Sequence, residues 1–213
     1  KGYAEAHFNC GNIFKLQRRL DAAIESYDEA IQLNPDYDEA YNNRGVALYE
    51  LARFEEALQS YSVAIKIKKD YFEAYSNRGL VLYELNRLEE ALNSLSKAIE
   101  LNPDYADAYF NKGIILSEQK NFKDGLACYE KAIELKREYH KAYFNRGIVL
   151  KELNRLNAAI ESYDKAIEFK SDYAEAYNNR GVVLYELKYL DEALQCYDRA
   201  IQIKPNYSEA YNN

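Results

Sequence analysis

The strongest constraint on the fold is a 34-residue period that runs through the whole chain. The stretch AYNNRGVALYEL at residues 40–51 returns as AYNNRGVVLYEL at residues 176–187, which is 136 residues, or four periods, later. Without insertion or deletion, the period defines six units at residues 2–35, 36–69, 70–103, 104–137, 138–171 and 172–205, and a partial seventh at 206–213. Such a period predicts a stack of equivalent units, each of which buries its apolar face against its neighbours.

Apolar residues within a unit follow two helical stretches. In the second unit, one stretch runs from Asp38 to Leu51 and the other from about Phe54 to Ile67, both with 3.6-residue spacing. Asp36, with Glu39 three residues later, predicts an N-cap and its acidic partner, and Asp70, Asp104 and Asp172 repeat this arrangement. Small residues such as Gly45 predict a close approach between the two helices of a pair.

Residues at fixed offsets make up a known pattern of aromatic, glycine, alanine, aromatic and alanine positions with a closing proline. In the second unit these positions hold Tyr41, Gly45, Leu48, Ala57, Tyr61 and Ala64, with Lys69 where proline is usual. The chain therefore resembles the tetratricopeptide repeat family. The resemblance implies an all-α fold, an α-solenoid of antiparallel helix pairs in a right-handed superhelix, as a single array over residues 1–213.

Residues at the same position of successive repeats form a column. The column directly before the glycine is basic here, whereas the family usually has leucine at this position. Its members are Arg44, Arg78, Lys112, Arg146 and Arg180, with Cys10 in the first unit. The column lies inside the apolar arc, so the aliphatic stem is expected to pack while the charged end reaches outward. Pairing of that end with a carboxylate of a neighbouring repeat is our hypothesis.

Charge and composition exclude several classes of function. The net charge is −7, which does not suit binding to a nucleic-acid backbone. No apolar stretch approaches the ~20 residues that span a bilayer, and no signal peptide is visible, so a soluble, cytoplasmic protein is expected. Cys10, Cys128 and Cys196 predict free, buried thiols of a reducing compartment. Neither His7 nor His140 has metal-ligand spacing, and we expect no cofactor.

The face of the first helix opposite the core is where function is expected, because the family lines its concave surface with first helices. An aliphatic column marks the centre of that face: Val46, Leu80, Ile114, Ile148 and Val182, enlarged by Phe8, Phe110 and Phe144. Two interpretations stay open. The column forms the floor of a groove for an extended segment of another protein, or neighbouring helices of the same chain cover it.

An asparagine column runs beside the aliphatic one: Asn9, Asn43, Asn77, Asn111, Asn145, Asn179 and Asn213. An amide side chain matches one peptide unit of a ligand, so a ladder of asparagines predicts contact with a peptide backbone. The alternative is that each asparagine bonds to the adjacent repeat or to local backbone. A similar ladder occurs in the repeats of O-linked N-acetylglucosamine transferases, and this resemblance favours the peptide groove.

Acidic residues and tyrosines refine the expected ligand. One acidic column comprises Glu5, Glu39, Glu73, Asp107, Glu175 and Glu209, with Lys141 as its interruption, and another comprises Glu50, Glu84, Glu118, Glu152 and Glu186. Tyr49, Tyr83 and Tyr185 add amphipathic area of the kind found at interfaces. A neutral to basic ligand with apolar anchors is expected, whereas solvated helix charge would explain either column alone.

The sequence predicts a protein–protein interaction scaffold with no catalytic residues, because its two histidines lie in different repeats and it has no phosphate-binding loop. Chaperone-binding members of the family hold the C-terminal carboxylate of their ligand with a clamp of basic and asparagine side chains. Every basic member of that clamp is replaced in this chain, which argues against binding of a chaperone tail. Two alternatives are the substrate-recognition region of a larger enzyme, such as a glycosyltransferase of the kind named above, and a structural solenoid with head-to-tail self-association. The chain ends favour excision from a longer array or larger protein.

Overall fold

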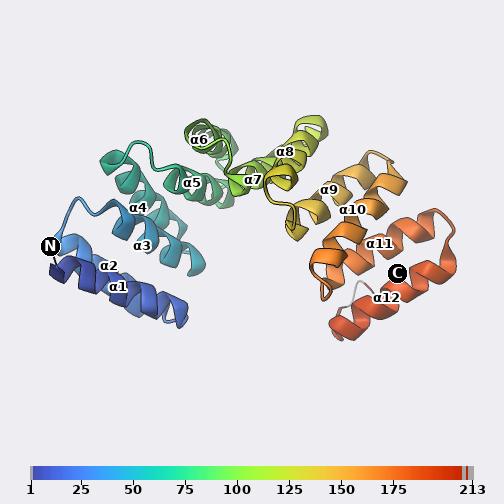
Figure 1. Ribbon diagram of the computed structural model, residues 1–213, viewed down its shortest axis with the longest axis horizontal. Coiled ribbons are helices and arrows are strands. Elements are labelled where there is room, and N and C mark those ends of the chain that lie inside the picture. The colour runs from blue at the N-terminus through green and yellow to red at the C-terminus, as the bar shows by residue number, and fades with distance from the viewer. Residues whose placement is uncertain (1, 208–209, 211–213) are drawn as a thin grey trace. The chain divides into compact units, whose positions relative to one another are not determined.

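Every regular element in the described part of the chain is an α-helix. The computed structural model describes residues 2–207 and residue 210, so Glu209 and Asn213 lie outside the described residues. The helices are α1 (Gly2–Leu16), α2 (Leu20–Leu33), α3 (Asp38–Glu50), α4 (Phe54–Ile67), α5 (Phe72–Glu84), α6 (Leu88–Leu101), α7 (Ala106–Glu118), α8 (Phe122–Leu135), α9 (His140–Glu152), α10 (Leu156–Phe169), α11 (Ala174–Glu186) and α12 (Leu190–Ile203). Each repeat contributes an odd-numbered first helix and an even-numbered second helix (Figure 1). The predicted all-α solenoid of helix pairs is confirmed.

The chain forms two compact units, residues 1–111 and residues 112–213, with the boundary inside α7. Within unit 1, successive helices from α1 to α6 pack on one another, and α3 contacts both α1 and α5. Within unit 2, successive helices from α8 to α12 pack on one another, and α9 also contacts α11. First helices therefore lie next to one another in each unit and present a common face. A single array over residues 1–213 stays a prediction.

Close packing inside each repeat depends on the glycine of the first helix. A methyl group added at Gly45 would lie 2.7 Å from the ring of Tyr61, and one at Gly147 would lie 2.6 Å from the ring of Tyr163. Both tyrosines are buried, with 2% and 0% of their surface exposed. The missing side chain therefore makes the space that the aromatic ring of the second helix fills, which confirms the predicted close approach.

The predicted N-caps are wrong. α3 follows Tyr37 and has no side-chain cap, because Asp36 lies inside a turn that the Tyr37 amide closes by donating to the carbonyl of Asn34 at 3.1 Å. Pro35 occupies the second position of this turn, which its fixed φ favours. The turns before α5 and α11 are built in the same way and end at Tyr71 and Tyr173.

A left-handed residue ends each first helix. After α3, the Ala52 amide donates to the Tyr49 carbonyl at 2.9 Å and the Arg53 amide to the Leu48 carbonyl at 2.9 Å, which is the Schellman arrangement. Ala52 has a φ of 56°, where glycine is the usual residue. Non-glycine residues hold this conformation at the equivalent turns of the described repeats: Arg18, Ala52, Asn86, Lys120, Asn154 and Lys188.

The cysteines are free thiols, but they differ in exposure. Cys196 is buried and Cys128 is partly buried, whereas Cys10 is exposed. The prediction of a buried thiol is wrong for Cys10, whose position in the repeat holds Arg44, Arg78, Lys112, Arg146 and Arg180 in the later repeats. Among the described helices, none combines the length and apolar character that crossing a membrane requires.

Candidate functional site

The common face of the first helices carries the aliphatic, asparagine and acidic columns. We call it the first-helix face. In unit 1 it belongs to α1, α3 and α5, and in unit 2 to the end of α7, α9 and α11. Every member of the aliphatic column on this face is half-buried: Val46, Leu80, Ile114, Ile148 and Val182. The column is therefore neither a solvated surface nor fully covered by its own chain.

On the first-helix face of unit 1, amide side chains bond to one another between repeats. Asn43 Nδ2 donates to Asn12 Oδ1 at 2.9 Å, and Asn77 Nδ2 donates to Asn42 Oδ1 at 3.1 Å. Asn12 Oδ1 also accepts the hydroxyl of buried Tyr27 at 2.8 Å. Burial raises the pKa of Tyr27 to about 12, so the hydroxyl stays a donor at neutral pH. These contacts match the alternative in which the asparagines serve the protein's own packing.

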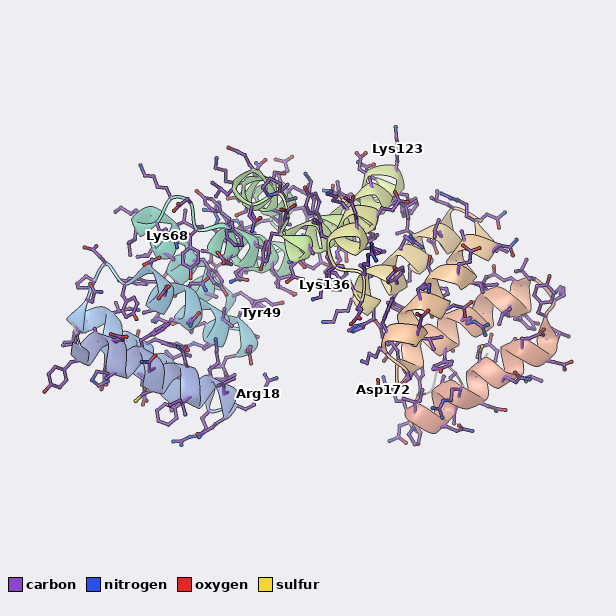
Figure 2. All side chains as sticks on the ribbon, viewed as in Figure 1. Arg18, Tyr49, Lys68, Lys123, Lys136 and Asp172 are labelled. Atoms are coloured by element: carbon purple, nitrogen blue, oxygen red, sulfur yellow. The ribbon has the colours of Figure 1, made fainter. Side chains whose placement is uncertain are left out.

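Two glutamates on the same face of unit 1 also have partners within the chain. Arg18 Nη1 donates to Glu50 Oε2 at 2.6 Å, and the Tyr49 hydroxyl donates to Glu84 Oε1 at 3.1 Å. Figure 2 shows Arg18 and Tyr49 near the ends of α1 and α3. Burial and the neighbouring Glu84 carboxylate raise the pKa of Tyr49 to about 12. Arg18 therefore neutralises the charge of Glu50, whereas Glu84 keeps its charge and gains a hydrogen bond from Tyr49.

The first-helix face of unit 2 is hollowed. A hollow of about 310 Å³ lies between α7, α8 and α9, and it is lined by Ile114, Ser117, Glu118, Lys120, Phe122, Tyr129, Asn145, Ile148, Val149 and Glu152. We call it the α7–α9 hollow. A smaller hollow of about 150 Å³ shares Ile148 and Glu152 with it and is also lined by Lys151, Tyr163, Asn179 and Val182. The two hollows bring together members of the aliphatic, asparagine and glutamate columns.

Asn145 differs from the asparagines of unit 1 in its partner, whereas Asn179 repeats a contact of unit 1, in which Asn42 Nδ2 donates to Asn43 Oδ1 at 3.3 Å. Asn145 Nδ2 donates to the Lys141 carbonyl of its own helix at 3.0 Å, and Asn179 Oδ1 accepts from Asn178 Nδ2 at 3.4 Å. An asparagine amide has two donor hydrogens and an acceptor oxygen, so hydrogen-bonding capacity remains at both positions.

The other predicted site residues lie in varied surroundings. Phe110 is buried, and the ring centroid of Phe144 lies 4.8 Å from that of Tyr173. Tyr83 and Asn111 are half-buried, Asn9 is exposed, and Tyr185 is 53% exposed.

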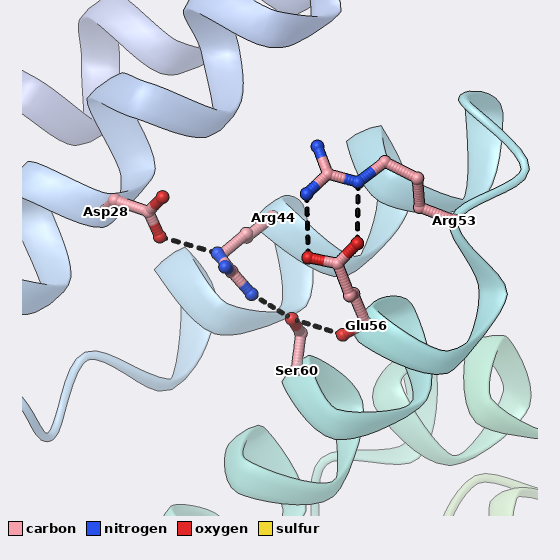
Figure 3. A network of polar contacts seen from close by, with 5 residues as sticks. All are labelled: Asp28, Arg44, Arg53, Glu56 and Ser60. Carbon is pink, nitrogen blue, oxygen red and sulfur yellow. Dashed lines mark hydrogen bonds and ion pairs between the residues drawn. The ribbon is translucent and has the colours of Figure 1, made fainter.

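The basic column connects helices rather than facing a ligand. Arg44 Nε donates to Asp28 Oδ1 of the preceding repeat at 2.6 Å, and Arg44 Nη1 donates to Ser60 Oγ of its own repeat at 2.8 Å (Figure 3). Arg180 has the same geometry with Asp164 at 2.6 Å and Cys196 at 2.9 Å. The hypothesis of a carboxylate in a neighbouring repeat is confirmed for these two arginines.

Two other arginines of that column bond within their own repeat. Arg78 Nε donates to Ser94 Oγ at 2.9 Å, and Arg146 Nε donates to Ser162 Oγ at 3.1 Å. The residue that corresponds to Asp28 is Ser62 in the repeat before Arg78. Burial lowers the pKa of Arg78, whose guanidinium nevertheless stays charged at neutral pH.

Sequence reasoning missed the tyrosines that end the turns between repeats. These residues follow the same 34-residue period: Tyr37, Tyr71, Tyr105, Tyr139, Tyr173 and Tyr207. Lys68 Nζ lies 4.6 Å from the ring centroid of Tyr71, and Lys136 Nζ lies 4.5 Å from that of Tyr139. The signal is the repeat period itself, but these positions lie in the turns before the first helices and outside the apolar helical pattern.

No group of three or more histidine, cysteine, aspartate and glutamate side chains in the described part of the chain has a geometry that fits a metal ion. The site is therefore built from hydrogen-bonding amides, carboxylates and apolar walls.

Comparison with models of known protein families shows which family the chain belongs to. Models of the TPR repeat match residues 11–52, 48–86, 79–120 and 149–188, and models described as tetratricopeptide repeat match residues 106–139, 174–207 and 128–161. The chain belongs to the tetratricopeptide repeat family. No curated protein sequence matches it significantly.

Solved structures with this tetratricopeptide repeat fold are similar over most of their length. YrrB, described as a TPR protein with an unusual peptide-binding site, is 25% identical, with a TM-score of 0.68, and the match covers 89% of this chain and 97% of YrrB. PilW, described as a type IV pilus biogenesis factor, is 20% identical, with a TM-score of 0.89 and coverage of 98% and 97%. PilF of Pseudomonas aeruginosa is 18% identical, with a TM-score of 0.87 and coverage of 99% and 96%. At these last two identities the likeness concerns the fold alone.

Proposed function

We propose that this tetratricopeptide repeat protein is a non-catalytic interaction module that holds an extended segment of another protein on the first-helix face of unit 2. The α7–α9 hollow carries the proposal, because it combines an apolar floor with amide and carboxylate side chains. Ligand sites have this composition, in which apolar walls supply affinity and a few polar groups fix orientation. The similarity to YrrB, whose description names a peptide-binding site, supports the proposal.

The asparagines give the proposed site a way to hold peptide backbone. Asn145 and Asn179 lie on neighbouring first helices, and each lines one of the two hollows. Since each amide retains unused hydrogen-bonding capacity, the pair can bond to successive peptide units of an extended ligand without reading its sequence. Ile148, shared by both hollows, supplies the apolar contact between the two amides.

A peptide array of unrelated sequences tests the proposal. The protein is expected to bind a subset of peptides, and replacing both Asn145 and Asn179 by alanine is expected to weaken that binding about thirtyfold, since each of the two net hydrogen bonds contributes about 1 kcal/mol. The matched control replaces Asn43 and Asn77, the corresponding pair of unit 1, which bond within the chain. This control is expected to lower stability and to leave binding unchanged.

Changing the apolar floor provides an independent test. Ile148→Gln is expected to reduce peptide binding, whereas Leu194→Gln on α12, where the side chain is 61% exposed, is expected to leave it unchanged. Thermal unfolding of each variant separates loss of binding from loss of folding. Absence of any array binder, or equal effects of the two substitutions, would contradict the proposed function.

Head-to-tail self-association stays a separate prediction. Light scattering across a concentration series tests it, because association raises the average mass with concentration. A monomer at every concentration would remove self-association as a function and would leave the peptide proposal intact.

A further inference from the structure

Glutamates of the first helices share an arrangement in which the preceding repeat supplies a partner. Glu50 accepts from Arg18 at 2.6 Å, and Glu84 accepts from Tyr49 at 3.1 Å. In unit 2, Lys151 Nζ lies 3.4 Å from Glu186 Oε1. Tyr49 and Lys151 occupy the same position of the repeat, one residue before the last residue of the first helix. A long side chain at that position therefore reaches the glutamate of the next repeat.

Glu152 is the exception. The position that corresponds to Tyr49 and Lys151 is Ser117 in the preceding repeat, and the Ser117 hydroxyl donates to the Gly113 carbonyl of its own helix at 2.7 Å. Within residues 2–207, no hydrogen bond or ion pair of Glu152 is found. Serine is too short to bridge two repeats, so the carboxylate lacks the partner that its counterparts have.

The short side chain of Ser117 also explains why the α7–α9 hollow exists. Ser117 and Glu152 line the same α7–α9 hollow of about 310 Å³, together with the aliphatic side chains of Ile114 and Ile148. Lys151 occupies the position of Ser117 one repeat later and shows that a lysine fits there. Its side chain is 31% exposed, and its ammonium group contacts Glu186. An aliphatic stem packed on apolar walls with a charged end at a carboxylate is how lysine and arginine bury themselves partially.

We propose, as an extension that rests on the proposed function, that the α7–α9 hollow accepts a lysine or arginine side chain of the bound segment. The stem packs on Ile114 and Ile148, and the cation pairs with Glu152. The ligand thus replaces the side chain that repeat four lacks, and the Lys151–Glu186 contact one repeat later shows the geometry. Specificity for a basic residue follows from charge complementarity between the cation and the exposed Glu152 carboxylate at the edge of half-buried aliphatic side chains.

Lys120 is the cationic side chain in the lining of the α7–α9 hollow, where Glu118 and Glu152 are the carboxylates. It corresponds in the repeat to Arg18 and lines the hollow, yet it forms no ion pair with Glu152 in the described structure. The other nearby cation, Lys151, is paired with Glu186. Lys120→Gln is therefore expected to raise the affinity of a cationic ligand severalfold, because a like charge leaves the site.

Two small probes test the pocket without knowledge of the natural partner. Nα-acetyl-arginine methylamide carries the cation, and Nα-acetyl-norleucine methylamide carries an uncharged stem. With the full chain labelled at isoleucine methyl groups, NMR titration follows the signals of Ile114 and Ile148. The arginine compound is expected to shift both signals with an affinity at least about tenfold above that of the norleucine compound. Glu152→Gln is expected to abolish this difference.

A substitution that fills the hollow from within gives the sharpest test. Ser117→Lys places a lysine where Lys151 stands one repeat later, so it is expected to pair with Glu152, to retain the stability of the fold and to lose the arginine response. Leu194→Lys on α12, where the side chain is 61% exposed, is the matched control and is expected to keep the response, because it adds the same charge outside the hollow. Conversely, Lys151→Ser frees Glu186 and is expected to create a second response at the neighbouring repeat.

The outcomes separate this inference from the proposed function. If neither probe shifts the Ile114 and Ile148 signals, or if the two probes bind equally well, the basic-residue pocket is wrong even when array peptides bind to unit 2. If the arginine probe binds as described but no array peptide does, the pocket stands and the peptide-binding function is wrong. Unchanged arginine binding in Ser117→Lys would also overturn the pocket.

Discussion

The first-helix faces of unit 1 and unit 2 derive from the same repeat but are used differently. In unit 1, Asn43 bonds to Asn12 and Tyr49 bonds to Glu84, so polar groups are satisfied between repeats of the chain. In unit 2, Asn145 bonds to its own helix backbone and Glu152 faces a hollow. A repeat position is therefore available to a ligand only where the adjacent repeat fails to supply its partner.

This difference requires few substitutions. The residue that accepts from Asn43 is Asn12, and the corresponding residue for Asn145 is Ile114, which cannot accept a hydrogen bond. The residue that donates to Glu84 is Tyr49, and the corresponding residue for Glu152 is Ser117. Asn12 stands in the first repeat, whereas the later repeats carry the aliphatic column at that position. Ser117 is therefore the one change of these two that is particular to repeat four, and it leaves Glu152 at the hollow between α7 and α9.

The largest expected effect tests the part that the two units share. Tyr61→Ala in unit 1 and Tyr163→Ala in unit 2 are each expected to cost about 3–5 kcal/mol in the free energy of unfolding, because each ring fills the space above a glycine. Urea unfolding measures both. A cost in one unit that is several kcal/mol below the cost in the other would show that the cores are not equivalent.

Alkaline pH is expected to weaken both units through their buried tyrosines. Burial raises the pKa of Tyr27 and of Tyr129 to about 12, from the ordinary tyrosine value of 10.0. Because the folded pKa lies above the unfolded one, the stabilisation is complete below pH 10 and is lost as pH rises towards 12. Each of these tyrosines is expected to reduce stability by about 1.4 kcal/mol per pH unit in that window.

Denaturant unfolding at increasing pH, with the ultraviolet absorbance of tyrosinate as a second probe, measures this loss. Tyr27→Phe is the control and is expected to flatten the pH dependence. Ionisation of Tyr27 or Tyr129 in the folded protein near pH 10 would contradict the prediction.

The amide networks are expected to separate the two units. Asn12→Ala removes the acceptor of both Tyr27 and Asn43, so it is expected to cost about 1–3 kcal/mol. Asn145→Ala in unit 2 is expected to change stability by less than about 0.5 kcal/mol, because its amide bonds only to its own helix and alanine favours a helix. Equal costs in the two variants would remove the distinction between a self-bonded and an open face.

The smallest expected effect concerns the turns within a repeat. Ala52 in unit 1 and Asn154 in unit 2 both have a φ of 56°, a conformation that asparagine tolerates better than alanine. Ala52→Gly is expected to stabilise the protein by about 0.5–1 kcal/mol, and Asn154→Gly by less. Thermal unfolding of the two variants gives the comparison, and an unstable Ala52→Gly variant would show that the turn is not strained.

The sequence alone predicts the helices because their signals are local and repeat many times. The stretch from Phe54 to Ile67 was predicted as a helix and is α4. Gly45 predicted a close helix pair and lies against the ring of Tyr61. The N-cap at Asp36 was wrong because the Tyr37 amide closes a turn there, which a local acidic pattern does not reveal.

From the sequence, the candidate site could be predicted only as columns of equivalent residues, without the partner of each side chain. Asn43 and Asn145 occupy the same repeat position with nearly the same local sequence, yet one bonds across repeats and the other to its own helix. Arg44 and Arg78 differ in the same way, because a carboxylate stands opposite only the first of them. Each choice depends on a residue about one repeat away.

By itself, the sequence determined the period, the two helices of each repeat and the glycine contacts that let the helices of a pair approach. The tertiary structure decided which polar side chains are satisfied within the chain and where a hollow remains. Helices form from neighbours within one turn, whereas the partner of a surface side chain comes from the adjacent repeat and depends on its length and chemistry. Ser117 beside Glu152 is the pair in which that dependence leaves a carboxylate without a partner among the described residues.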